Sequence, residues 1–108
     1  MNWTEKRCKP CEGGVQPYSL EEARKNLTTL SGWVLSPEGK AVQKEYKFEN
    51  FKEVISFFNR IAALSEEENH HPELKISYNR VAVELSTHSV KGLTENDFIL
   101  AAKFDAAR

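Results

Sequence analysis

Apolar and polar residues follow two periods along this chain, and each change of period marks an expected element. The first helix is expected to begin at Ser19, because Ser19 and Glu22 have the spacing of a capping box. Apolar residues continue at helical spacing as far as Leu30, and Gly32 is expected to end the segment.

A second, longer helix is expected after Asn50, which repeats the cap pattern with Glu53. Phe57 and Leu64 widen its apolar stripe, which favours deep burial over a partner surface. Pro72 disfavours helical backbone at the residue before it, so this helix is expected to end ahead of the adjacent histidines. The stripe itself has helical spacing and consists of Phe51, Val54, Ile55, Phe58, Ile61 and Ala62.

Period-two patterns predict two hairpins, one on each side of the second helix. Residues 33–35 and 42–48 are joined by a turn sequence at 36–39, and residues 74–78 and 81–85 by a tight turn. A last helix is expected after Thr94, with Asp97 at its third position. Its apolar residues are Phe98, Ile99, Leu100, Ala102 and Phe104.

The element order α-β-β-α-β-β-α predicts an α+β fold in a single domain, residues 1–108. We expect one four-stranded antiparallel sheet with three helices packed on one face. The other face and the strand edges then stay available for self-association.

Composition narrows the possible partners. Fifteen basic and sixteen acidic residues leave a net charge of -1, which gives no footprint for nucleic acid or an anionic membrane. No apolar run reaches transmembrane length, and the first residues lack the apolar stretch of a signal peptide. These features predict a soluble, cytoplasmic protein with a small-molecule partner.

The two cysteines form a lone Cys8-Lys9-Pro10-Cys11 motif. A second pair or a nearby histidine would be needed to complete a tetrahedral zinc site, and a thioredoxin-like role needs a preceding strand. The pattern favours a thiol pair on a loop over a metal or redox site, with both alternatives left open.

All three histidines lie in one third of the chain beside several carboxyls, which favours acid/base chemistry near neutral pH. His70 and His71 are held extended by the following proline, so their side chains should diverge and not chelate one metal together. A metal site formed with His88 and Glu66 is the weaker alternative. Asp97 fits a helix cap as well as a catalytic role.

The string Glu66-x-x-x-His70-His71-Pro72-Glu73, followed by Leu85-Ser86-Thr87-His88 and Gly92-Leu93-Thr94 with Asp97, closely resembles the pterin-4a-carbinolamine dehydratase family. Tyr78-Asn79 and the Cys8–Gly14 stretch are similar as well. The resemblance covers nearly the whole chain. It implies dehydration of 4a-hydroxytetrahydrobiopterin to quinonoid dihydropterin, without a metal or organic cofactor.

Roles follow from the resemblance position by position. His70 and His88 look like the proton-transfer residues, with their acid and base roles unassigned, and His71 looks like a pterin contact. Glu66 and Asp97 look like supporting carboxyls. Relatives often carry an acid where this chain has Asn69, an amide that can bond a pterin edge but brings no charge. The expected lining of the pocket is Asn69, His70, His71, Ser86, Thr87, His88 and Ser89.

The resemblance also leaves functional alternatives. Animal relatives act as dimerisation cofactors of a transcription factor, so an interaction module is the second candidate, and another pterin-related activity is the third. The family suggests a homodimer or homotetramer, with no nucleic acid bound directly.

Overall fold

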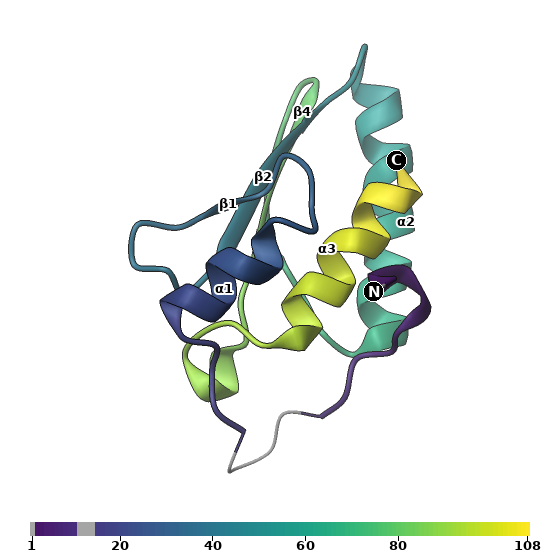
Figure 1. The fold of residues 1–108 in the computed structure, drawn as a ribbon. Coiled ribbons are helices and arrows are strands. Elements are labelled where there is room, and N and C mark those ends of the chain that lie inside the picture. The colour runs from purple at the N-terminus through teal and green to yellow at the C-terminus, as the bar shows by residue number, and fades with distance from the viewer. Residues whose placement is uncertain (1, 11–14) are drawn as a thin grey trace.

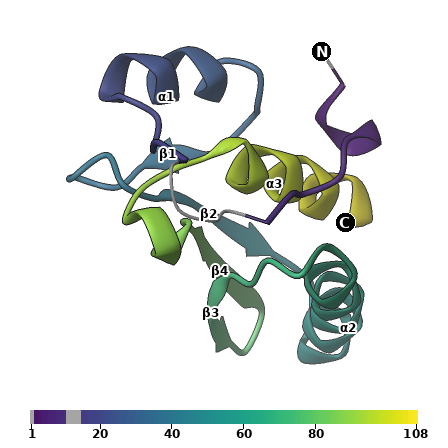
Figure 2. The ribbon, with the colours of Figure 1, turned by 90° about the horizontal axis from the view of Figure 1, so that it is seen from below.

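The computed structural model describes residues 2–10 and 15–108, which fold into a four-stranded sheet covered by helices (Figure 1). The strands are β1 (Val34–Leu35), β2 (Val42–Lys47), β3 (Glu73–Ser77) and β4 (Arg80–Leu85). They are antiparallel in the order β1-β2-β4-β3. The three helices, α1 (Leu20–Leu27), α2 (Phe51–Glu68) and α3 (Glu95–Ala107), lie on one face of the sheet (Figure 2). The predicted α+β order is confirmed.

Two short 3-10 helices were not predicted, η1 (Trp3–Glu5) and η2 (His88–Val90). Helix α1 has the predicted Ser19 capping box but ends at Leu27, short of Leu30. The hydroxyls of Thr28 and Thr29 donate to backbone carbonyls of the last turn, and this local bonding competes with continuation of the helix.

Helix α2 runs from the predicted Asn50 cap to Glu68, and so ends before the histidine pair as expected. The predicted stripe is wrong at Phe51, whose side chain is 49% exposed, whereas Phe57 is fully buried. The buried positions Val54, Phe57 and Ile61 face α3 and the sheet. The buried face of α2 is therefore rotated by about one residue from the predicted apolar stripe.

Helix α3 lies between α1 and α2 and is buried on almost every side (Figure 2). Phe98, Ile99, Leu100 and Ala101 are all buried, so its apolar pattern shows little helical periodicity. Ala101 and not the predicted Ala102 is the fully buried alanine. The inward residues of β4 pack below this helix and complete the core. None of the described helices is long and apolar enough to cross a membrane.

Candidate active site

All three histidines line one cavity of about 580 Å³, formed where α2 ends, β4 ends and α3 begins. Every residue that the sequence predicted as pocket lining contributes to its wall. The predicted supporting carboxyls Glu66 and Asp97 lie outside the wall, each bonded to one of the histidines. The wall is formed by Cys8, Lys9, Pro10, Glu67, Glu68, Asn69, His70, His71, Ser86, Thr87, His88, Ser89 and Asn96.

The exit from α2 places the adjacent histidines. Asn69 caps the helix in the left-handed conformation, with φ 52°, a region in which asparagine is enriched. The His70 N–H then returns to the carbonyl of Ser65 at 3.1 Å. Pro72 keeps the following backbone extended. Asn69 therefore has a backbone role that explains an amide here, independently of any contact with a ligand.

His70 is bonded to a fully buried carboxylate. Its Nε2 lies 2.6 Å from Oδ1 of Asp97, whose side chain is 0% exposed, while the His70 side chain is 11% exposed. Since the ionised carboxylate can only accept, Nε2 carries the proton, and Nδ1 is the ring nitrogen left for a ligand. This pair joins the end of α2 to the start of α3.

The Asp97 carboxylate makes hydrogen bonds through both of its oxygens. Its Oδ2 accepts hydrogen bonds from the Thr94 backbone N–H at 3.0 Å and from the Thr87 hydroxyl at 2.8 Å. The first bond belongs to the capping box that starts α3, as predicted from the sequence. The cap and the contact with His70 use different oxygens of one carboxylate, so the two interpretations of Asp97 are compatible.

His71 is arranged differently from its neighbour. Its Nε2 lies 2.5 Å from Oε2 of Glu66, and the two side chains are 54% and 78% exposed. A pair this exposed contributes little to stability. The two adjacent imidazoles thus bond carboxylates from different helices, and the described residues contain no group of three or more histidine, cysteine or acidic side chains that could hold a metal ion.

His88 reaches the cavity from the segment that follows β4. Strand β4 ends at Leu85, so the alternation that would have placed His88 on the sheet stops, and His88 begins η2. The loop is closed by the Thr87 N–H, which donates to the Gly92 carbonyl at 2.8 Å. A side chain at Gly92 would come within 2.8 Å of Pro17, so this close approach requires glycine.

Sequence reasoning missed one wall of the cavity. Cys8, Lys9 and Pro10 come from the N-terminal segment (residues 2–10), and Glu68 and Asn96 hold this segment in place. The sequence did contain one signal, the three consecutive acids at residues 66–68. Negative charge at the C-terminus of a helix is unfavourable for the helix dipole, which suggests that one of these carboxylates has another partner. Nothing in the local pattern connected that signal with residues so far away in sequence.

Cys8 is partly buried and follows η1 on an extended stretch, whereas Cys11 lies outside the described residues. Burial raises the pKa of the Cys8 thiol to about 12, and the negative charge of Glu68 adds to the effect. The thiol is therefore neutral near pH 7 and forms an uncharged part of the wall.

We expect Cys8 to react slowly with iodoacetamide. In a Cys11→Ser background at pH 8, native alkylation should be about 10–100-fold slower than in denaturant, since a raised pKa lowers the thiolate fraction more than it increases nucleophilicity. Mass spectrometry of a quenched time course measures both rates. Equal native and denatured rates would show that the thiol is not perturbed by its surroundings.

Comparison with known proteins agrees with the family that the motif indicated. The family model described as pterin 4 alpha carbinolamine dehydratase matches residues 16–107. The chain belongs to this family. It is 50% identical over 103 residues to a Rickettsia bellii protein, covering 94% of this chain and 90% of that protein. It is 42% identical over 106 residues to a Halorhodospira halophila protein, covering 98% and 97% respectively. Both carry the name "Putative pterin-4-alpha-carbinolamine dehydratase".

The chain is also similar to a protein of known structure. The crystal structure of a transcriptional coactivator/pterin dehydratase from Brucella melitensis superposes with a TM-score of 0.82 at 35% identity, covering 85% of this chain and 98% of that one. Pterin carbinolamine dehydratases are hydro-lyases, so the family is a family of enzymes.

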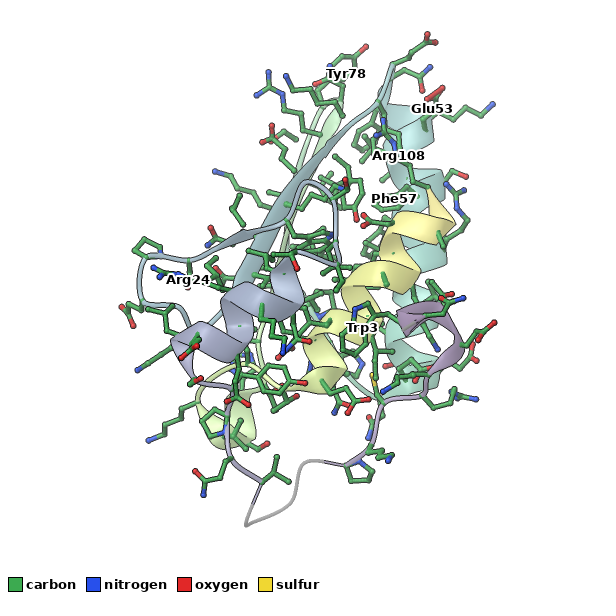
Figure 3. The ribbon with its side chains drawn as sticks, in the orientation of Figure 1. Trp3, Arg24, Glu53, Phe57, Tyr78 and Arg108 are labelled. Carbon is green, nitrogen blue, oxygen red and sulfur yellow. The ribbon has the colours of Figure 1, made fainter. Side chains whose placement is uncertain are left out.

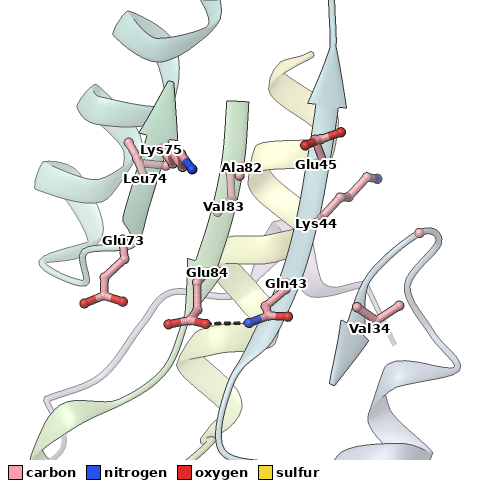
Figure 4. Close-up of a pocket in the computed structure, with 11 residues that line it drawn as sticks. Val34, Gln43, Lys44, Glu45, Glu73, Leu74, Lys75, Ala82, Val83 and Glu84 are labelled. Carbon is pink, nitrogen blue, oxygen red and sulfur yellow. Dashed lines mark hydrogen bonds between the residues drawn. The ribbon is translucent and has the colours of Figure 1, made fainter. Parts of the chain in front are cut away.

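A larger concavity of about 770 Å³ lies on the open face of the sheet, the face without helices (Figure 4). Its wall contains carboxylates and amines. Within this wall, a hydrogen bond of 2.6 Å joins Gln43 of β2 to Glu84 on the neighbouring strand β4. None of its lining residues is a histidine or a cysteine. For a dehydratase, the smaller cavity is the better candidate active site, because all three histidines line it and histidine is the commonest general acid or base near neutral pH.

Proposed function

We propose that this protein is a 4a-hydroxytetrahydrobiopterin dehydratase, which forms quinonoid dihydrobiopterin and water by histidine acid/base catalysis. The observation that carries the proposal is the His70–Asp97 pair in a cavity that His88 also lines. Membership of the dehydratase family supports the reaction class. The proposed pathway role is the recycling of tetrahydrobiopterin.

The chemistry requires two proton transfers. The hydroxyl on C4a leaves as water after it accepts a proton, the N5 proton is removed, and a C4a–N5 double bond forms. Imidazoles can do both near neutral pH. The mechanism uses side chains alone, without a metal or an organic cofactor.

The surroundings of the two histidines suggest how they divide these tasks. Asp97 stabilises the imidazolium that His70 becomes on accepting a proton, which favours His70 as the base toward N5. The His88 side chain is exposed, and no side chain in residues 2–10 or 15–108 hydrogen-bonds its ring. In the proposed mechanism, protonated His88 delivers a proton to the hydroxyl and is recharged from solvent.

The remaining residues complete the proposed site. His71, oriented by Glu66, contacts the pterin from the exposed side of the cavity. Asn69 and residues 86–89 present amide, hydroxyl and backbone groups that suit the polar edge of a pterin.

The direct test generates the carbinolamine with an aromatic amino acid hydroxylase and follows its decay spectroscopically. We expect catalytic amounts of this protein to accelerate the decay well above the spontaneous rate. Decay at the spontaneous rate, with folded protein present in excess, would refute the dehydratase assignment.

An interaction module is the second candidate, because the similar Brucella melitensis protein is named a transcriptional coactivator as well as a pterin dehydratase. The open face of the sheet is the surface available for such a role (Figure 4). The histidine cavity favours the enzyme. A variant that loses dehydration but still captures a partner would separate the two functions.

Location and assembly stay predictions. We expect a cytoplasmic protein that forms a homodimer or homotetramer. On α2, exposed Phe51 and the half-buried side chains of Ile55 and Phe58 form an apolar strip outside the core, which supports self-association.

A further inference from the structure

The N-terminal segment is bound across the two helix ends that carry the proposed catalytic pair (Figure 1). Its first turn is held by Trp3, which lies beside α3 (Figure 3). The Trp3 ring stacks on Phe98 of α3 with ring centroids 5.9 Å apart. The Trp3 indole N–H also donates to the Thr29 hydroxyl at 2.7 Å. The segment is therefore docked on the core before it reaches the cavity.

Glu68, the last residue of α2, binds the segment at the cavity. Its side chain is 1% exposed and receives the Cys8 backbone N–H at 2.8 Å, Arg7 at 2.8 Å and Lys103 at 2.8 Å. Burial of the carboxylate opposes ionisation, but the hydrogen bonds from Lys103 and Cys8 and the positive charges of Lys103 and Arg7 together lower the pKa of Glu68. A buried carboxylate lowers the stability of the fold unless its hydrogen-bond and ion-pair partners are all present. The proposed reaction does not use the Glu68 carboxylate.

Asn96 binds the next residue of the segment from the other helix. Its side-chain carbonyl accepts the Lys9 N–H at 3.0 Å, and its amide donates to the Lys9 carbonyl at 2.6 Å. Each of the two helix ends therefore contributes one residue that binds the segment and one residue nearby that belongs to the proposed catalytic pair. Glu68 and Asn96 hold the segment, while His70 and Asp97, one or two residues further on, form the proposed catalytic pair.

We propose that Cys8, Lys9 and Pro10 form a substrate-binding wall of the dehydratase site and that Glu68 is a positioning residue for this wall. The inference rests on the proposed function and adds a binding element that lies outside residues 16–107, the range matched by the family model. The wall encloses the pterin on the side of the helix ends. We expect it to act on binding and not on proton transfer, because the His70–Asp97 hydrogen bond is made without the segment.

The test measures KM and kcat separately for Glu68→Ala, Glu68→Gln and Asn96→Ala in the full chain. Glu68→Ala should raise KM about tenfold, the size of one hydrogen bond to a charged group, with kcat within about twofold. Glu68→Gln retains an acceptor for the Cys8 N–H and should raise KM less. If Glu68→Ala does not fold, Asn96→Ala, which frees the same wall from the other helix, decides the question.

Glu53→Ala is the matched control, since Glu53 is an exposed acid at the far end of the same helix (Figure 3). It should leave KM unchanged. A folded Glu68→Ala variant with wild-type KM, or with a lower kcat at constant KM, overturns the proposal. So does an equal rise of KM in Glu53→Ala.

A binding measurement separates this proposal from the proposed function. The dissociation constant of 7,8-dihydrobiopterin is measured by fluorescence for the same variants. If wild-type protein binds this pterin without accelerating dehydration, the dehydratase assignment fails, and weaker binding by Glu68→Ala still supports the wall. Unchanged binding by Glu68→Ala, or no pterin binding by wild type, overturns the wall.

Discussion

Replacing His70 with alanine is expected to lower kcat for carbinolamine dehydration by about 10²–10⁴-fold, the usual contribution of one positioned acid or base. The loss should fall on kcat and leave KM nearly unchanged, because the rest of the cavity wall remains. His88→Ala should have an effect of the same order, since the reaction needs both a proton donor and a proton acceptor.

Stopped-flow decay of hydroxylase-generated carbinolamine measures these rates, and circular dichroism confirms that each variant is folded. His71→Ala is the natural comparison within the motif, because its ring is half exposed and is paired with the exposed carboxylate of Glu66. We expect a smaller loss of kcat for His71→Ala than for its neighbour. Wild-type rates in both His70→Ala and His88→Ala would disprove the catalytic assignment.

Changing Asp97 to asparagine is expected to lower kcat by about 10²–10⁴-fold as well, although Asp97 lies outside the cavity wall. If the amide oxygen keeps the bonds from Thr87 and Thr94, its NH₂ group faces Nε2 of His70. Nε2 must then accept, which moves the ring proton to Nδ1, the nitrogen that would otherwise accept the proton from the substrate. The enzyme would hold its histidine in the wrong tautomer.

A purely structural role for Asp97 predicts a different result. Loss of a helix cap lowers the free energy of unfolding by about 1 kcal/mol without affecting kcat. Ser19→Ala, which removes the cap of α1 away from the site, is the matched control for that loss. Thermal unfolding and stopped-flow rates are measured for both variants. An Asp97→Asn protein with lower stability and wild-type kcat would show that the carboxylate is only a cap.

Local sequence patterns predicted the elements of this protein because each depends on residues close together in the chain. Pro72 placed the end of α2 before the histidine pair, and the Ser19 and Thr94 boxes placed two helix starts. Alternation placed β2, β3 and β4, and the apolar residues of β4 are buried, whereas Ile76 of β3 is 37% exposed. The residues that the family motif predicted as pocket lining all lie in the wall of one cavity, and their role in binding a substrate stays a prediction.

Other features depended on how the elements pack. The apolar stripe of α2 is wide, so periodicity alone could not tell that Phe57 faces inward while Phe51 remains exposed. Helix α3 is buried nearly all round, so its sequence carries little information about which side meets the sheet. The end of α1 was misplaced because threonine side chains, and not the apolar pattern, terminate it.

The sequence by itself determined the element order, the position of the histidines at element ends, and membership of a dehydratase family. Only the tertiary structure decided that Asp97 bonds His70, 27 residues away, and that Glu68 binds Cys8 at a separation of 60 residues. Periodicity and capping are local properties of the chain. Pairings across such separations are fixed by the burial of α2 and α3 in a common core, which brings their ends and the N-terminal segment around one cavity.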